Sequence, residues 1–218
     1  MRYSWLDGYL MAKPAVTKDF KPEWNWIRYF IGGKMFAAVL LDRENKPYYI
    51  NLKLEPLEGD FLRGQYDDIL PGYYSNKQHW NSVNPDGAVP DELLKQLLDK
   101  SYELVLAGLS KKKQQETLIT TYCGLDCTGC QWKEPCSCSG CVSTKGFPFH
   151  CNEEPCPVAL CNRNKGTLFC GLCDEFPCQL LTDYSFDKEH GDHPGGARIE
   201  ACRTIKALLK KKLHKRKT

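Results

Sequence analysis

The sequence predicts an α+β protein in two parts, and three observations support this prediction. Short apolar and aromatic runs separated by turn residues fill the first half, and one long amphipathic helix pattern follows them. All 13 cysteines lie at or after Cys123. A second helix pattern closes the chain. We therefore expect an antiparallel sheet with helices on one face over residues 1–115, a linker over 116–121, and a small cysteine-rich, metal-stapled domain over 122–218 that ends in a helix.

Four segments of the first part have the composition of β-strands. Residues 24–31 and 35–41 are rich in aromatic and branched side chains, and Gly32-Gly33 between them suits the tight turn of a hairpin. Residues 48–54 alternate, with Tyr48, Ile50, Leu52 and Leu54 on the apolar side, which predicts a third, half-buried strand. Residues 77–83 predict a fourth.

Three helices are expected around and after these strands. Pro56 suits the first turn of a helix that runs to about Ile69, where Pro71-Gly72 stops it. A long helix begins near Pro90, and its apolar stripe consists of Leu93, Leu94, Leu97, Leu98, Tyr102, Val105 and Leu109. The third helix begins at about Ala197, and its stripe consists of Ile199, Cys202, Ile205, Leu208, Leu209 and Leu213.

The first part resembles the YjbR/MmcQ family. The segments that carry the resemblance are GGKMFA (32–37), INLKL (50–54), PGYYSNKQHWNSV (71–83), DG (86–87), VPDELL (89–94) and SYELV (101–105). The resemblance implies a compact fold like that of the bacterial frataxin homologue CyaY. It also implies a double-wing mode of DNA binding, which is a weaker expectation because one fold hosts many functions.

Seven residues of the first part are candidates for a nucleic-acid surface, because they combine cations for phosphates with rings for stacking. They are Arg28, Lys34, Lys53, Tyr74, Lys77, His79 and Trp80. The alternative is structural: Tyr74 and Trp80 lie in the core, His79 is a satisfied polar residue and the lysines are a solvated face. Residues 1–120 carry 16 basic and 16 acidic side chains, and this neutrality favours the structural alternative.

No catalytic residues are predicted, since the carboxylates are scattered and His79 has no cysteine near it in the sequence. The chain ends in a basic stretch, residues 203–218, with eight Lys and Arg and no acid. That stretch suits either a polyanionic partner or a solvated helix end whose cations oppose the helix dipole.

The cysteines are expected to bind metal rather than to form disulfides. Residues 1–14 lack the apolar core of a signal peptide, and no stretch reaches the roughly 18 apolar residues of a membrane span. We therefore expect a cytoplasmic protein without a membrane partner, where thiolates persist. Three C-x2-C pairs, Cys127/Cys130, Cys138/Cys141 and Cys170/Cys173, have the spacing that turns two sulfurs toward one metal.

Twelve cysteines are the predicted ligands, enough for three tetrahedral sites, with His150 as a possible substitute. They are Cys123, Cys127, Cys130, Cys136, Cys138, Cys141, Cys151, Cys156, Cys161, Cys170, Cys173 and Cys178. The remaining one, Cys202, falls on the apolar stripe of the last helix and is expected to be a buried thiol. The cofactor expected is Zn²⁺, with an iron–sulfur cluster as the alternative, since both accept four cysteines. The spacing does not assign ligands to sites.

The cysteine-rich part resembles the domain of unknown function 3795. The resemblance rests on CGLDCTGC (123–130), CSGC (138–141), CPVALC (156–161) and C-x2-C-x-E-F-P-C (170–178), and it covers residues 122 to about 210. It implies a metal-binding domain without an assigned activity.

The function expected from the sequence is therefore that of a non-enzymatic metal-binding protein whose partner is DNA or RNA. Two alternatives remain open. One is a redox or metal-handling protein with an iron–sulfur cluster or labile thiolates, and the other is a scaffold for protein interactions.

Overall fold

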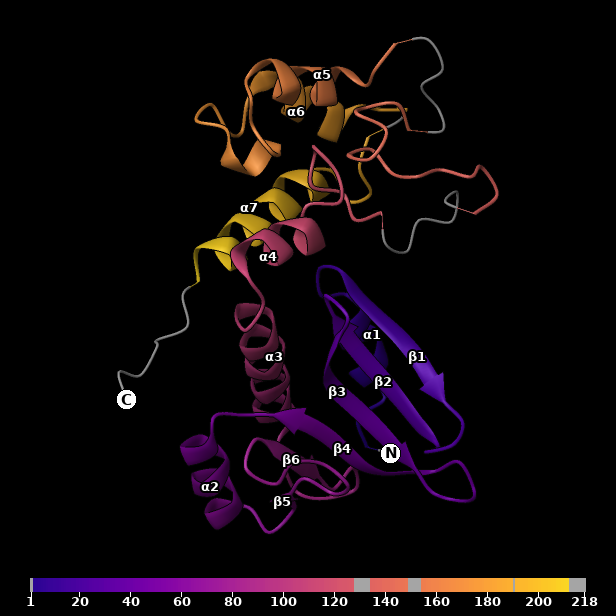
Figure 1. Ribbon diagram of the computed structural model, residues 1–218, viewed down its shortest axis with the longest axis vertical. Helices are drawn as coiled ribbons and strands as arrows, with labels where there is room; N and C mark the ends of the chain where they lie inside the picture. Colours follow the sequence, from indigo (N-terminus) through magenta and orange to yellow (C-terminus); the bar gives the residue numbers. More distant parts are fainter. Residues whose placement is uncertain (1, 128–133, 149–153, 190, 212–218) are drawn as a thin grey trace. The chain divides into compact units, whose positions relative to one another are not determined.

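The computed structural model describes residues 2–127, 134–148, 154–189 and 191–211. The chain divides into two compact units, Met1–Ser110 and Lys111–Lys212. Figure 1 shows a β-sheet with helices in the first unit, while the described part of the second unit contains helices and loops. The α+β class predicted from the sequence is confirmed.

The first unit is built on a six-stranded antiparallel sheet with the order β1-β2-β3-β4-β6-β5. Its strands are β1 (Val16–Lys21), β2 (Trp26–Ile31), β3 (Lys34–Leu41), β4 (Pro47–Lys53), β5 (Ile69–Pro71) and β6 (Trp80–Val83). Gly32 and Gly33 connect β2 to β3 with φ angles of 58° and 80°, the left-handed conformation that the glycine pair predicts for a hairpin turn.

Two helices, α1 (Leu6–Met11) and α3 (Asp91–Ala107), pack together on one face of this sheet. The Tyr29 hydroxyl of β2 donates to Asp7 of α1 at 2.8 Å, and the Tyr9 hydroxyl donates to Asp99 of α3 at 2.7 Å. Ser101 of α3 joins the helix to the sheet, because its Oγ donates to the Phe36 carbonyl at 2.6 Å and accepts from the Lys53 N–H at 2.7 Å. Of the predicted stripe of α3, all but the half-buried Leu93 are buried.

Several element boundaries differ from those that the sequence predicts. The helix that begins at Pro56 is α2 (Pro56–Gln65), so it ends before Ile69, which instead begins β5. The strand predicted from residue 77 begins at Trp80. Strand β1 and helix α1 were not predicted from the sequence. Strand β1 lies at the edge of the sheet and buries only Val16, so its sequence lacks the apolar alternation that indicates a strand.

The described part of the second unit contains four helices and one 3₁₀ turn. They are α4 (Lys111–Leu118), α5 (Pro157–Asn164), η1 (Cys170–Leu172), α6 (Gln179–Phe186) and α7 (Ala197–Lys210). Helix α4 contacts α7, buries Gln114 and Leu118, and overlaps the first residues of the linker predicted over 116–121. Helix α7 begins at Ala197 as predicted. No described helix is both long and apolar enough to cross a membrane.

Candidate functional site

The two segments Tyr122–Leu125 and Phe169–Leu172, each with the pattern aromatic-Cys-Gly-Leu, lie together in the second unit. The Cys170 N–H donates to the Tyr122 carbonyl at 2.8 Å. Both glycines lie against Cys202 of α7: a Cβ on Gly124 would come within 2.5 Å of the Cys202 Sγ, and one on Gly171 within 2.8 Å of the Cys202 carbonyl oxygen. Only glycine permits such close approach, and Gly124 also has a φ of +89°.

Cys202 is fully buried, as its place on the helical stripe predicts. Its thiol contacts the Cys123 carbonyl oxygen at 3.2 Å. Burial raises the pKa of Cys202 to about 12, and the nearby sulfurs of Cys170 and Cys123 add to the rise. Helix α7 therefore places the neutral thiol of Cys202 against the two cysteine-glycine segments.

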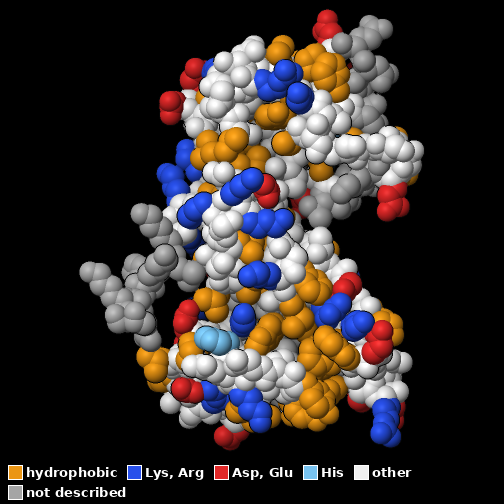
Figure 2. All heavy atoms as spheres, viewed as in Figure 1, with side chains coloured by type: hydrophobic (Ala, Val, Ile, Leu, Met, Phe, Trp, Pro, Cys, Tyr) orange, Lys and Arg blue, Asp and Glu red, His pale blue; other side chains and the backbone are white. Residues whose placement is uncertain are grey.

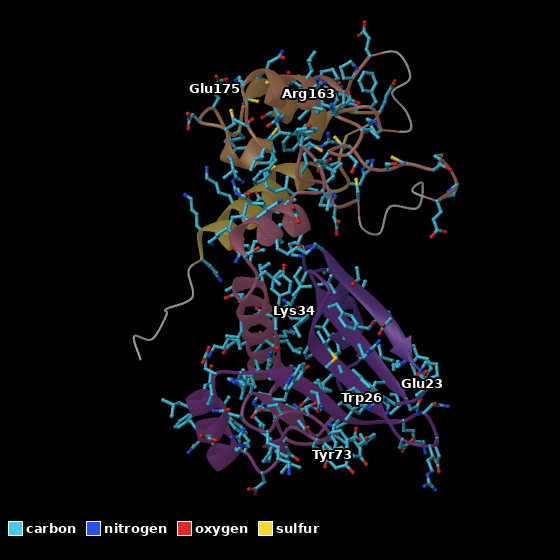
Figure 3. All side chains as sticks on the ribbon, viewed as in Figure 1. Glu23, Trp26, Lys34, Tyr73, Arg163 and Glu175 are labelled. Carbon is cyan, nitrogen blue, oxygen red and sulfur yellow. The ribbon has the colours of Figure 1, made fainter. Side chains whose placement is uncertain are left out.

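Cys141 is a buried cysteine that has other cysteine sulfurs near its own. Burial raises the pKa of its thiol to about 12, although the Tyr122 N–H donates to the sulfur and opposes this rise. The sulfurs of Cys123, Cys156 and Cys127 raise it further, so all three lie within electrostatic range of Cys141. Figure 3 shows sulfur atoms, in yellow, among the helices and loops of this unit.

Cys170 has a second set of neighbours. Burial raises the pKa of its thiol to about 11, while the Asn162 side-chain amide donates to the sulfur at 3.0 Å and opposes the rise. The nearby sulfurs of Cys123, Cys178 and Cys161 raise the pKa of Cys170 further. Lys165, which lies beside Cys173 and Cys161, is paired with Glu175 at 2.6 Å and so joins the end of α5 to the Cys173–Cys178 loop.

The twelve predicted ligands divide according to what the structure describes. Cys130, Cys151 and the substitute ligand His150 lie outside the described residues. Cys136 is exposed and Cys138 half-buried, and none of the eleven cysteines of the described ranges, Cys202 included, is in a disulfide. Within those ranges, no three Cys, His, Asp or Glu side chains are arranged as ligands of one ion. The donor chemistry of the sulfurs thus fits Zn²⁺ or an iron–sulfur cluster, whereas the described side chains do not converge on one point.

The sheet of the first unit has a second face, which we call the aromatic face. It is centred on a buried cluster of Trp26, Ala38 and Leu40, against which Met35, Tyr48 and Tyr49 pack. Tyr73, from the loop between β5 and β6, extends it with ring centroids 5.4 Å from Tyr49 and 6.0 Å from Tyr48. Figure 2 shows hydrophobic side chains gathered over this unit, and Figure 3 labels Trp26 and Tyr73 on it.

A buried polar network fixes the β5–β6 loop on the sheet. The Tyr73 N–H donates to the Ser82 Oγ at 2.8 Å, the Ser82 hydroxyl donates to the Asn51 Oδ1 at 2.6 Å, and the Asn51 Nδ2 donates back to the Tyr73 carbonyl at 3.1 Å. Asn51 and Ser82 are fully buried. The alternating pattern of residues 48–54 placed Asn51 on the polar side of its strand, so sequence reasoning missed its anchoring role.

The loop held in this way presents Tyr74 to solvent. Its side chain is 78% exposed, and its φ of 53° is uncommon for a residue with a large side chain. The segment from Leu70 to Lys77 lines an open hollow of about 630 Å³. The hydrogen bond to Tyr74 raises the pKa of the neighbouring Tyr73, whose ring centroid is 4.3 Å from that of Tyr74.

The seven predicted nucleic-acid residues fall into separate places. Lys53 and Trp80 are partners in the β4–β6 register, with the lysine Nζ 5.8 Å from the Trp80 ring, and His79 precedes Trp80 in the chain. Trp80 is 8% exposed, as the structural alternative predicted, whereas Tyr74 is not in the core. Tyr74 and Lys77 share the hollow.

The other two predicted residues lie on strands further along the sheet. Arg28 belongs to β2, where its Nη2 is 2.6 Å from Asp19. Lys34 begins β3 and lies well apart from Tyr73 in Figure 3. The structure therefore brings Tyr74 to Lys77 and Lys53 to Trp80, and it places Arg28 and Lys34 elsewhere.

The YjbR family model matches residues 11–104. The uncharacterized protein YjbR of Escherichia coli K12 is 33% identical over 115 residues, which cover 53% of this chain and 96% of the relative. The chain belongs to the YjbR family. YbdF of Escherichia coli O157:H7 is 38% identical over 44% of this chain and 75% of its own, and YyaQ of Bacillus subtilis is 26% identical over 43% and 85%.

Two solved structures are similar to about half of the chain. The crystal structure of Deinococcus radiodurans protein DR2400, a DUF419 domain, is 30% identical and covers 51% of this chain and 84% of its own, with a TM-score of 0.46. A protein from Pseudomonas syringae is 23% identical over 48% of this chain and 98% of its own, with a TM-score of 0.40.

The YjbR match includes all seven predicted nucleic-acid residues and ends before the first cysteine. It also includes Asn51, Tyr73 and Ser82, the anchor of the β5–β6 loop. The match thus leaves out the whole cysteine-rich unit of this YjbR-family protein.

Proposed function

We propose that this YjbR-family protein is a non-enzymatic binding protein whose second unit holds Zn²⁺ through cysteine thiolates. The observation that carries the proposal is the gathering of cysteines from distant segments: the Cys170 N–H donates to the Tyr122 carbonyl at 2.8 Å, and the glycines that follow Cys123 and Cys170 both lie against Cys202. Buried thiols without a metal are weak hydrogen-bonding groups, whereas a soft metal ion binds several thiolates at once. The resemblance of residues 122–210 to the domain of unknown function 3795 supports the same proposal.

Elemental analysis of the freshly purified full chain, read together with its absorption spectrum, tests this proposal. We expect a colourless protein with several equivalents of zinc, because redox-inactive Zn²⁺ suits sites that staple a fold. A brown protein that contains iron and inorganic sulfide would overturn zinc and support the redox or metal-handling alternative. A folded protein free of any metal would overturn metal binding itself.

For the first unit we propose that single-stranded nucleic acid binds along the β5–β6 loop. The favouring observation is Tyr74, an exposed ring held in a left-handed conformation beside an open hollow that Lys77 also lines. An exposed ring offers a stacking platform to any base, and a neighbouring ammonium offers a contact to phosphate. Lys53 adds a second cation on β4, while Arg28 is committed to Asp19.

Replacing Tyr74 tests this second proposal. We expect Tyr74→Ala to weaken binding of a fluorescein-labelled oligothymidine about 5- to 150-fold, because one stacked base contributes about 1–3 kcal/mol. Fluorescence anisotropy at several salt concentrations provides the measurement, and the affinity of the unaltered protein should fall as salt rises. Phe61→Ala is the matched control, since Phe61 is a similarly exposed ring carried by α2.

Two results would contradict nucleic-acid binding at this loop. One is affinity that does not change with salt, because phosphate contacts release counterions. The other is an equal loss in Tyr74→Ala and Phe61→Ala, which would show that any exposed ring serves. The first result would leave an interaction scaffold as the function of the first unit, and the second would move the binding away from this loop.

A further inference from the structure

Helices α4 and α7 bring cations from two distant segments of the second unit to one surface, which we call the basic surface. The Lys111 Nζ in the first turn of α4 donates to the Leu209 carbonyl in the last turn of α7 at 3.4 Å, although the two residues are 98 positions apart. Figure 2 shows Lys and Arg side chains, in blue, gathered over these two helices. The exposed and half-buried cations of the basic surface are Lys111, Lys112, Lys113, Arg203, Lys206 and Lys210.

The charge of these two helices is opposite to that of the segment between them. Residues 119–196 carry ten Asp and Glu but only five Lys and Arg. Helices α4 and α7 together carry seven Lys and Arg and two acids, and one of those cations, Arg198, is buried against Asp192. Cations segregated in this way create a positive potential over one part of a surface, which attracts a polyanion.

The lysines of α4 lie at the end of the helix where a cation is least favourable. Lys111, Lys112 and Lys113 form the first turn, which contains no acid and carries the positive end of the helix dipole. Compensation of the dipole of α7 accounts for Lys210 in its last turn and for Lys111, which contacts the Leu209 carbonyl. It does not account for Lys112 and Lys113. A local preference broken without a local gain is typical of a functional surface.

The side chains of the basic surface suit phosphates rather than bases or lipid tails. Among the described side chains of α4 and α7, no large apolar or aromatic one is exposed. Binding of single strands relies on rings that stack on bases, and helices that lie in a membrane surface insert apolar side chains between the lipids. A duplex offers one negative charge per about 1.7 Å of its axis, twice the density of one strand. A surface that attracts by charge alone therefore favours the duplex.

We propose that the basic surface binds the phosphate backbone of double-stranded nucleic acid. Two of its cations form exposed pairs with acids of their own helix, Lys112 with Glu116 at 3.9 Å and Arg203 with Glu200. Such exposed pairs contribute little, so both cations remain available to phosphate. Contacts to phosphates carry no sequence information, and we therefore expect similar affinity for duplexes of different sequence. The proposal goes beyond the function proposed above and rests neither on the Tyr74 loop nor on which metal the cysteines bind.

Two double variants of the full chain as purified test the proposal, one on each helix. Lys112→Gln combined with Lys113→Gln removes two charges from α4, and Arg203→Gln combined with Lys210→Gln removes two from α7. Fluorescence anisotropy of a short fluorescein-labelled DNA duplex, measured at several salt concentrations, gives the slope of log affinity against log salt concentration. We expect each double variant to reduce the magnitude of this slope by about 2, because each phosphate contact contributes about 0.9 to it.

Lys145→Gln combined with Lys188→Gln is the matched control. Both lysines are exposed in the second unit and lie outside α4 and α7, so this variant has the same net charge as the other two. It should keep the slope and the affinity of the unaltered chain. An unchanged slope in either helix variant, or an equal reduction in the control, would overturn the proposal. Circular dichroism checks that each variant is folded, and if one is not, the other helix variant decides.

Two further measurements separate this proposal from its alternatives. Tyr74→Ala should leave duplex binding and its salt slope unchanged, even if it weakens the binding of oligothymidine. A loss of duplex affinity in Tyr74→Ala without a loss in the helix variants would place the duplex on the first unit and overturn the proposal. Vesicles of phosphatidylserine and phosphatidylcholine test a membrane partner by cosedimentation. Binding to these vesicles without binding to the duplex would overturn the proposal in favour of an anionic membrane surface.

Discussion

Removal of the metal from the full chain is expected to unfold the second unit and to leave the first unit folded. The described part of the second unit buries few large apolar side chains: beyond α4 the main ones are Ile119, Val158, Phe169, Leu181, Ile199 and Ile205. The first unit, whose sheet is covered by α1 and α3, buries many more large apolar side chains. Structural zinc sites contribute about 10–16 kcal/mol in small peptides, so a unit with so small a core depends on them.

Hydrogen–deuterium exchange with mass spectrometry measures this in the intact chain. After chelation, peptides from residues 111–210 should lose their protection, while peptides from β3, β4 and α3 should keep it. Restoring zinc should restore the protection, which is the control for damage by the chelator. Unchanged protection of α5 and α7 in a sample shown to be metal-free would contradict the expectation.

A buried ion pair gives the second large effect. Asp192 accepts from the Arg198 Nε at 2.7 Å and from the Arg198 N–H at 2.8 Å, and the Ser185 hydroxyl donates to it at 2.5 Å. The two charged side chains are 2% and 9% exposed. Burial raises the pKa of Asp192, but the Arg198 N–H, the Ser185 hydroxyl and the guanidinium outweigh it, so the pKa lies below its ordinary value.

Asp192→Ala is therefore expected to lower the free energy of unfolding of the second unit by about 3–5 kcal/mol, because it leaves the Arg198 charge buried without a partner. Thermal or urea unfolding of the metal-loaded chain, followed by exchange in α6 and α7, measures the loss. Glu200→Ala is the control on the same helix. It breaks an exposed i,i+3 pair with Arg203, for which we expect a change of at most about 0.5 kcal/mol.

A result below about 1 kcal/mol for Asp192→Ala would contradict the interpretation of this pair as a buried one. It would show that Arg198 finds solvent once its partner is removed. Equal losses in Asp192→Ala and Glu200→Ala would point to an effect of charge on α7 in general.

The sequence was sufficient to predict those elements in which local pattern and burial agree. The β2–β3 hairpin follows from Gly32-Gly33, and α3 follows from its apolar stripe, since each element buries the residues that its period brings to one side. Strand β1 escaped prediction because its polar residues suit an exposed edge. Strand β5 is three residues long and ends in Pro71, too short for any periodicity to show.

The candidate sites were predictable in kind but not in arrangement. Clustered cysteines indicate metal ligands, yet the backbone hydrogen bond that joins the Cys170 segment to Tyr122 is a contact that no spacing reveals. Asn51 was placed on the polar side of β4 by its alternation, and its burial follows from a loop more than twenty residues away. The alternation of residues within β4 therefore gives no information about the loop that buries Asn51.

The two glycines that rest on Cys202 set a practical limit on how this protein can be divided. A fragment cut after Cys178 would contain all twelve candidate ligands but would lack the helix surface on which both aromatic-Cys-Gly-Leu segments are seated. Its cysteines would be held by metal alone, free to exchange partners among themselves. Experiments on an isolated module should therefore retain the chain at least as far as Lys210.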